Sequence, residues 1–173
     1  MKKIYSLSLL VFFVSCQEIK PRQPINKNEV RNLSSSAKRN KNLFTQEELL
    51  INSAAKKDSS YIYKKAPSGY LFAYVNKSSD YFKFPQKGEL VSFEYSIETL
   101  QKELLYNKKE LGIVNYRIDQ EDLLPALREG LRIMKVNEVV VFLFPSYLCY
   151  GYQGDGNKIG INQPLRFTIE RLN

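Results

Sequence analysis

The stretch LLPALREGLRIMKVNEVVVFLF, residues 123–144, decides the fold of this chain. Four apolar side chains recur in it at helical spacing: Leu123, Leu127, Leu131 and Met134. Pro125 falls in the first turn, where its missing N–H costs no hydrogen bond, and Asn137 follows at a position suited to a left-handed helix stop. The apolar run 139–144 is typical of a buried strand. The stretch therefore predicts one amphipathic helix followed by a strand of the core.

Segments with a period of two lie on both sides of this helix. Apolar and polar side chains alternate between residues 91 and 97, and the same alternation returns over residues 165–170. Shorter strand signals, separated by turns, occur at residues 61–63, 70–75 and 116–118. One helix among about five to six antiparallel strands indicates an α+β fold in which the sheet wraps around the helix.

The first sixteen residues have the pattern of an export signal. Two lysines precede the apolar run 4–14, which at ~1.5 Å per residue is too short to cross a ~30 Å hydrocarbon core. The break FVSC at residues 13–16 resembles a bacterial lipobox, in which the cysteine is diacylated and becomes the new N-terminus. We therefore predict a lipoprotein signal peptide over residues 1–15 and lipidation of Cys16. An ordinary signal peptide with an incidental cysteine is the alternative.

A stalk and a short helix are predicted between the signal and the main domain. Residues 16–43 are rich in Asn, Ser, Lys, Arg and Pro and show no periodicity, which indicates a flexible basic stalk. A short N-terminal helix is predicted within residues 44–60, because Thr45 and Glu48 form a capping-box pattern ahead of several apolar residues, and it should end before Asp58. The main domain is expected over residues 61–173.

Composition narrows the possible chemistry. Histidine is absent and there are only two cysteines, which excludes Ser-His triads, Cys-His dyads and His-ligated or Cys₄ metal sites. With Cys16 lipidated, Cys149 is expected to be a free, buried thiol. The net charge of +8 would suit nucleic acid, but residues 66–173 carry 13 basic and 13 acidic side chains. The excess charge precedes residue 66, so we expect contact with an anionic membrane surface and no nucleic-acid partner.

Four further motifs are visible in the main domain. They are EGLRIMKVNE (129–138), FPSYLCYG (144–151), IGINQPLRF (159–167) and PQKGELVSFEY (85–95). They resemble the helix-to-strand junction, a strand end, the closing loop with the final strand, and the opening hairpin of FKBP-type (macrolide-binding) peptidyl-prolyl isomerases. The resemblance covers residues 61–173 and implies an FKBP-like fold. The lipoprotein form with its stalk is similar to the gliding-motility-associated FKBP-type lipoproteins of Bacteroidetes.

This resemblance implies an apolar pocket that stabilises a twisted X-Pro amide without a cofactor or a metal. By motif position, the catalytic residues would be Tyr95, Leu123, Leu124, Leu127, Tyr150, Ile159 and Phe167. The periphery of the substrate pocket would be formed by Leu105, Tyr106 and Val114. The hydroxyl of Tyr150 and the backbone N–H of Leu124 would orient the substrate carbonyls.

The chain departs from the family pattern at several of these positions. Tyr106 stands where the family usually has an aspartate, Lys158 where it usually has an isoleucine, and Leu127 where it often has a tryptophan. Two functions are therefore considered. The first is a monomeric isomerase, lipid-anchored in the bacterial cell envelope with its domain in the periplasm, which acts on proline-containing polypeptides during the folding of exported proteins. The alternative is a catalytically weak or inactive binding or chaperone module in a membrane assembly, such as a gliding-motility machinery.

Overall fold

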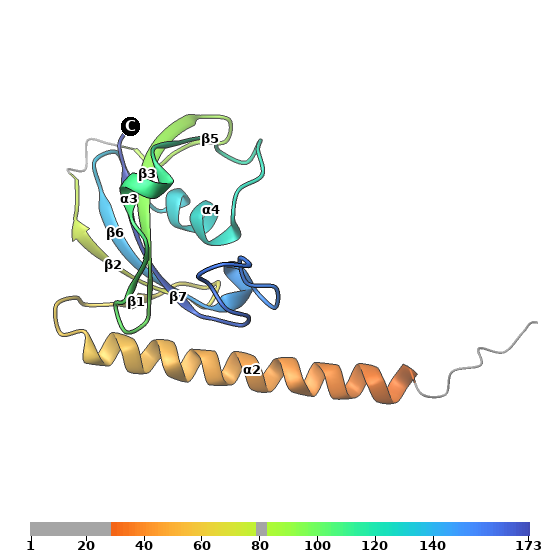
Figure 1. Cartoon of the computed structure of the whole chain (residues 1–173). Coiled ribbons are helices and arrows are strands. Elements are labelled where there is room, and N and C mark those ends of the chain that lie inside the picture. The colour runs from red at the N-terminus through yellow and green to blue at the C-terminus, as the bar shows by residue number, and fades with distance from the viewer. Residues whose placement is uncertain (1–28, 79–82) are drawn as a thin grey trace, which may run out of the picture. The chain divides into compact units, whose positions relative to one another are not determined.

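The computed structural model describes residues 29–78 and 83–173, and the predicted signal peptide and Cys16 lie outside this range. The strands of the described part form one sheet (Figure 1): β1 Lys64–Lys65, β2 Leu71–Asn76, β3 Leu90–Thr99, β4 Leu104–Tyr106, β5 Val114–Arg117, β6 Val139–Phe144 and β7 Leu165–Arg171. The helices are α2 Glu29–Lys57, α3 Lys108–Leu111, α4 Pro125–Arg132 and the 3₁₀ turn η2 Ser146–Leu148. The sheet and α4 together position the residues of the predicted pocket.

Every strand pairing in the sheet is antiparallel. The strands lie in the order β1-β2-β6-β7-β3-β4, and β5 also pairs with the first half of β3. The predicted α+β class is confirmed, with a sheet of seven strands in the described residues rather than five or six. The additional strand is β4, which has only three residues, too few for an alternating pattern to be visible in the sequence. The strand predicted at residues 61–63 is not formed, and the chain pairs with β2 only at Lys64–Lys65.

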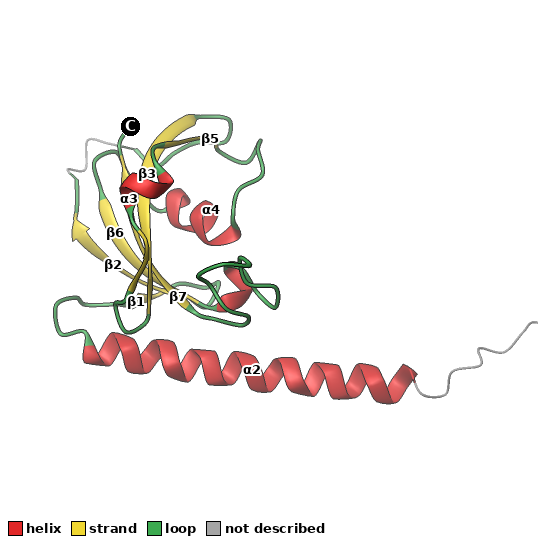
Figure 2. Ribbon diagram, viewed as in Figure 1, coloured by secondary structure: helices red, strands yellow, loops and turns green. Residues whose placement is uncertain are grey.

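Helix α4 lies on one face of the sheet (Figure 2) and buries the apolar side chains Leu127 and Leu131 in the main core. Gly130 lets the helix approach the sheet closely, since a Cβ at this position would lie 3.1 Å from Cζ of Phe142. Asn137 has the expected positive φ of 63°, but α4 already ends at Arg132 with Ile133 as its C-cap, so Asn137 turns the chain ahead of β6 and is not the helix stop. The helix and the strand predicted from residues 123–144 are both confirmed.

Helix α2 is longer than the helix predicted near the N-terminal side of the domain. It begins at Glu29, whereas the sequence predicted an irregular stalk up to residue 43 and a helix only from residue 44. The stalk prediction is therefore wrong from Glu29 onward, because a polar segment without periodicity can still be helical where its side chains are exposed. Among the described residues, no helix has both the length and the apolarity needed to cross a bilayer.

The predicted capping box at Thr45 is not formed. Thr45 lies inside α2, and its hydroxyl donates a hydrogen bond to the carbonyl of Lys41 at 3.0 Å. The helix ends at Lys57, directly before Asp58, where the sequence predicted its end. Residues Arg39–Asn173 form one compact unit, so the last part of α2 belongs with the sheet rather than forming a separate peripheral helix.

The last part of α2 packs on the face of the sheet opposite to α4. Ile51 is buried against Leu71 and Leu143, which alternate along β2 and β6 with residues of the α4 core. Glu47, 2% exposed, accepts hydrogen bonds from the backbone N–H of Ser146 at 2.7 Å and from its hydroxyl at 2.6 Å. Apolar contacts around Ile51 and the buried carboxylate of Glu47 thus fix the last part of α2 to the sheet and to η2.

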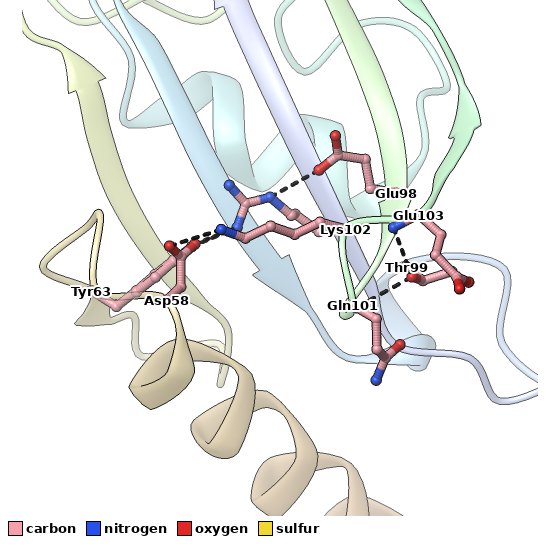
Figure 3. Close-up of polar contacts among 8 residues, drawn as sticks. Asp58, Tyr63, Glu98, Thr99, Gln101, Lys102 and Glu103 are labelled. Atoms are coloured by element: carbon pink, nitrogen blue, oxygen red, sulfur yellow. Dashed lines mark hydrogen bonds and ion pairs between the residues drawn. The ribbon is translucent and has the colours of Figure 1, made fainter.

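A second buried carboxylate, Asp58, follows the end of α2 directly (Figure 3). One oxygen lies 2.8 Å from the guanidinium of Arg166 on β7 and accepts the Tyr63 hydroxyl at 3.0 Å, and the other lies 3.0 Å from the ammonium of Lys102. Nε of Arg166 lies 2.9 Å from a carboxylate oxygen of Glu98 on β3. Only 4% of the Asp58 side chain and 7% of the Arg166 side chain are exposed. The network ties the end of α2 to two central strands.

Candidate active site

The ten side chains predicted for the pocket all belong to one apolar cluster around α4. Three of them are buried in the cluster: Leu127, Ile159 and Phe167. The others pack against it while remaining partly exposed: Tyr95, Leu105, Tyr106, Val114, Leu123, Leu124 and Tyr150. The cluster joins the start of α4 to the strands β3, β4, β5 and β7 and to the loop between η2 and β7.

Aromatic rings from three strands meet within this cluster. The rings of Tyr95 on β3 and Phe167 on β7 are stacked, with centroids 6.0 Å apart and planes inclined by 8°. Phe144, at the end of β6, contacts Phe167 edge-on at 5.6 Å. Stacked and edge-on arrangements are both favourable for aromatic pairs. The sequence placed Phe144 only in a strand, because its ring contacts depend on a strand register that the sequence does not reveal.

Among the ten predicted pocket residues, two tyrosine hydroxyls have no hydrogen-bond partner in the described part of the chain. They belong to Tyr95 and Tyr150, whose side chains are both partly buried. Burial raises the pKa of both phenols, and the neighbouring Tyr95 and Cys149 raise the pKa of Tyr150 further. Both hydroxyls are therefore neutral at physiological pH and can donate a hydrogen bond to a bound molecule.

The start of α4 has a backbone donor without an acceptor. Leu124 precedes the helix with φ −48° and ψ 127°, an extended conformation that Pro125 favours in the residue before it. The carbonyl of Leu124 accepts a hydrogen bond from the N–H of Arg128 at 3.1 Å, whereas its own N–H has no acceptor in the described part of the chain. Such free N–H groups at a helix start can bind a carbonyl oxygen.

Asp155, in the loop between η2 and β7, is a residue that sequence reasoning did not single out. Its carboxylate accepts hydrogen bonds from the N–H groups of Asn157 at 2.8 Å and Ile159 at 2.7 Å, and from the hydroxyl of Tyr106 at 2.5 Å. Desolvation raises the pKa of Asp155, but these hydrogen bonds outweigh it and hold the pKa below its usual value. The sequence offered only an Asp-Gly pair, which is typical of any turn.

Tyr106 and Lys158, two of the departures from the family pattern, contact each other. The ammonium of Lys158 lies 4.5 Å from the centroid of the Tyr106 ring, which is within the range of a cation–π interaction. It also donates a hydrogen bond to the carbonyl of Leu105 at 2.8 Å and lies 3.1 Å from a carboxylate oxygen of Glu110. Lys158 therefore contacts β4 and α3.

The cluster combines aromatic and aliphatic surface with neutral hydrogen-bond donors. The two charged side chains at its edge, Asp155 and Lys158, are already bonded to groups of the loop, of β4 and of α3. Surroundings of this kind can bind an apolar ring together with a peptide carbonyl. One hydroxyl of the cluster is paired with a carboxylate, that of Tyr106 with Asp155, and the same carboxylate also accepts two N–H groups of the loop.

The chain matches known proteins in sequence. The profile of the FKBP-type peptidyl-prolyl cis-trans isomerases matches residues 82–172, just over half of the chain. A probable FKBP-type peptidyl-prolyl cis-trans isomerase FkpA from Neisseria meningitidis is 32% identical over 89 residues, which make up 51% of this chain and 32% of that protein. The match thus spans about a third of the length of this curated relative.

Solved structures share the fold. A peptidyl-prolyl cis-trans isomerase from Pseudomonas syringae aligns over 77% of this chain and 93% of its own, with a TM-score of 0.60 and 18% identity. FkpA from Escherichia coli aligns over 100% of this chain and 81% of its own, with the same TM-score and identity. The family profile and the shared fold agree with the motifs found between residues 85 and 167. This chain belongs to the family of FKBP-type peptidyl-prolyl cis-trans isomerases.

Proposed function

We propose that this chain is an active prolyl isomerase that accelerates rotation about X-Pro bonds in polypeptides. The observation that supports this most is the pair of free donors, the Tyr150 hydroxyl and the Leu124 N–H, in the cluster that contains the stacked rings of Tyr95 and Phe167. A substrate carbonyl needs such donors, and a proline ring needs such an apolar surface. The profile match to the isomerase family supports the same activity.

The proposed reaction needs no acid, base or metal. Resonance keeps the amide planar and gives its rotation a barrier of ~18–20 kcal/mol. The twisted amide of the transition state has lost this resonance and much of its polarity. Apolar surroundings therefore favour the twisted form over the planar form, which is better solvated in water. Each tenfold gain in rate requires about 1.4 kcal/mol of such preferential stabilisation.

Each of the ten predicted pocket residues has a role in this proposal. Tyr95, Leu127, Ile159 and Phe167 form the apolar wall around the proline ring, and Leu123 lies beside them at the start of α4. Tyr150 and Leu124 donate hydrogen bonds to carbonyl oxygens of the substrate and so fix the orientation of the amide. Leu105, Val114 and the ring of Tyr106 contact the part of the peptide that lies outside the ring site, whereas the Tyr106 hydroxyl is bonded to Asp155.

A refolding assay tests the activity. The full chain should accelerate, at catalytic concentration, the refolding of a protein whose slow phase is limited by X-Pro isomerisation, a step that otherwise takes tens to hundreds of seconds. Tyr150→Phe removes one hydroxyl and keeps the ring. Because one hydrogen bond contributes about 1 kcal/mol, this variant should lose about fivefold in kcat/KM. No acceleration by the wild-type chain would refute the proposal.

A matched pair of variants separates the site from the core. Phe167 and Phe142 are both fully buried on neighbouring strands, but only the Phe167 ring is stacked on Tyr95, whereas Phe142 contacts Tyr70 and Phe144. Phe167→Leu and Phe142→Leu should both lower the melting temperature. Measured well below both melting temperatures, kcat/KM should fall markedly only for Phe167→Leu. An equal fall for the two variants would argue against the assigned site.

We propose further that the domain is tethered in the bacterial cell envelope through an acylated Cys16. The FVSC motif supports this, as does the excess of basic residues ahead of the domain, since basic side chains near an anionic surface each contribute up to ~1 kcal/mol. The tether would keep the isomerase near exported proteins as they fold. Metabolic labelling with a radioactive fatty acid should label the wild-type protein and not Cys16→Ala. Equal labelling of both would refute the assignment.

A further inference from the structure

The loop between η2 and β7 is held to β4 by the carboxylate of Asp155. Oδ1 accepts the N–H groups of Asn157 and Ile159, at 2.8 and 2.7 Å, so this oxygen shapes the loop itself. Oδ2 accepts the hydroxyl of Tyr106 at 2.5 Å, a residue that precedes Asp155 by 49 positions and ends strand β4. Both carboxylate oxygens are thus in use, one within the loop and one across to the sheet.

Lys158 provides a second connection from the same loop. Its ammonium donates to the carbonyl of Leu105 at 2.8 Å, lies 3.1 Å from a carboxylate oxygen of Glu110 on α3, and lies 4.5 Å from the centroid of the Tyr106 ring. Tyr106 therefore contacts Asp155 through its hydroxyl and Lys158 through its ring. The three side chains Tyr106, Asp155 and Lys158 form one connected group, called the latch below.

The latch surrounds a residue of the candidate active site. Ile159 directly follows Lys158, its N–H is bonded to Asp155, and its side chain is 4% exposed within the apolar cluster. The loop is closely packed behind it, since a Cβ on Gly154 would lie only 2.4 Å from the carbonyl oxygen of Ile159. The N–H of Gly154 is also bonded to the carbonyl of Tyr150 at 3.2 Å. The position of Ile159 relative to Tyr150 therefore depends on how this loop is held.

We propose that Tyr106, Asp155 and Lys158 are positioning residues, which hold the loop against β4 so that Ile159 and Tyr150 form a pre-arranged site for the X-Pro segment. This inference rests on the proposed isomerase function. The latch adds no chemical step of its own. By keeping the loop closed before substrate arrives, it reduces the ordering that binding must otherwise supply, and so it acts mainly on substrate affinity.

Tyr106→Phe tests the latch with the removal of a single oxygen atom. Tyr152→Phe is the matched control, because Tyr152 lies in the same loop, is 77% exposed, and has a hydroxyl bonded only to its neighbour Gln153 among the described residues. Tyr106→Phe should raise KM for a proline-containing peptide by roughly threefold to tenfold and leave kcat nearly unchanged. Tyr152→Phe should change neither parameter.

Hydrogen exchange gives a readout that does not depend on activity. The amide of Ile159 donates to Asp155, so loss of the Tyr106 hydroxyl should accelerate its exchange by roughly threefold to tenfold, whereas the amides of β7 should be unaffected. Lys158→Met should likewise raise KM and accelerate exchange of the Ile159 amide. Lys158→Arg should keep KM close to the wild-type value, because it keeps the charge. When Asp155 is already replaced by asparagine, Tyr106→Phe should change KM and the exchange of the Ile159 amide less than it does in wild type, since the two groups act through one contact.

The outcomes separate the latch from the proposed function. An inactive wild-type chain would overturn the isomerase proposal and with it the role of the latch in substrate binding. An active wild type in which Tyr106→Phe matches Tyr152→Phe, in KM and in exchange of the Ile159 amide, would overturn the latch alone. A lower melting temperature for Tyr106→Phe with unchanged KM at temperatures where the variant is folded would also overturn it, since that pattern indicates a purely structural contact.

Discussion

Replacing Asp58 by asparagine should destabilise the protein strongly, because this carboxylate holds several donors at the junction of α2 and the sheet. Asp58 lies 2.8 Å from Arg166 and 3.0 Å from Lys102, and it accepts the hydroxyl of Tyr63 at 3.0 Å. Asparagine has nearly the same shape and keeps one oxygen acceptor, but it carries no charge. The substitution therefore isolates the electrostatic part of the network.

The expected loss follows from the burial of the two ionic partners. Removing one partner of a buried ion pair costs about 3–5 kcal/mol, because the other charge stays buried without compensation. Arg166, 7% exposed, retains Glu98 at 2.9 Å, which places Asp58→Asn at the lower end of this range. The contact with Lys102 adds less than about 1 kcal/mol, since 48% of that side chain is exposed. We expect a loss of about 3 kcal/mol, which corresponds to a drop of about 10 °C in melting temperature for a domain of this size.

Urea denaturation followed by circular dichroism measures this loss. Glu48→Gln is the matched control, because it makes the same carboxylate-to-amide change on α2 in an exposed pair with Lys65, with side chains 51% and 57% exposed. The control should change the free energy of unfolding by less than about 1 kcal/mol. A loss for Asp58→Asn as small as that of the control would refute the assignment of a buried, stabilising charge network.

The pH dependence gives a second check on Asp58. Desolvation raises the pKa of this carboxyl, but the hydrogen bonds from Lys102 and Arg166 outweigh it and hold the pKa well below its usual value of about 3.9. A group with a depressed pKa in the folded state stabilises the fold above its unfolded pKa and loses this effect as the pH falls through the folded pKa. The difference in stability between wild type and Asp58→Asn should therefore be constant from pH 7 to about pH 5 and shrink below about pH 4. A constant difference down to pH 2 would contradict the depressed pKa.

Three further predictions concern other buried groups. Glu47→Gln should lower the free energy of unfolding by about 1–3 kcal/mol in urea denaturation, because the amide cannot accept both hydrogen bonds of Ser146 as the carboxylate does. Gly130→Ala should lower the melting temperature although alanine is the better helix former, because its Cβ would lie 3.1 Å from Cζ of Phe142; an unchanged or higher melting temperature would show that α4 can shift. Burial raises the pKa of the Cys149 thiol, so Cys149 should resist iodoacetamide at pH 8 in the folded protein and react after denaturation, as peptide mass mapping can determine. Fast labelling of Cys149 in the folded protein would be inconsistent with its burial.

The parts of the fold that the sequence predicted well are those with local causes. In residues 123–144, the period of the leucines, the proline at the first helical position and the asparagine at the turn each act within a few residues, and α4 and β6 have the predicted positions. Strands β3 and β7 alternate over ten and seven residues, which is long enough for the pattern to be visible.

The parts that the sequence did not predict depend on contacts with distant segments. The first half of α2 has a polar composition that is compatible with either coil or helix, so no local signal decided between them. The role of Asp155 depends on Tyr106, 49 positions earlier, and on a β4 strand of only three residues. The ten residues expected in the pocket could be named because the family motifs fix their positions, whereas the contact between Tyr106 and Lys158 arises from substitutions that the motifs do not contain.

The place of β7 in the sheet has a consequence for how the chain folds during synthesis. β7 follows all the other strands in the chain but lies in the middle of the sheet, between β6 and β3. Until residue 171 has left the ribosome, β3 and β6 lack their common neighbour, and the buried side chains Leu165, Phe167 and Ile169 are missing from the core. At ~5–20 residues per second, β6 therefore lacks this neighbour for roughly one to five seconds, although β2 can already pair with β6, and β4 and β5 with β3. Closure of the sheet is therefore a late, long-range event, because it requires β7 between β6 and β3.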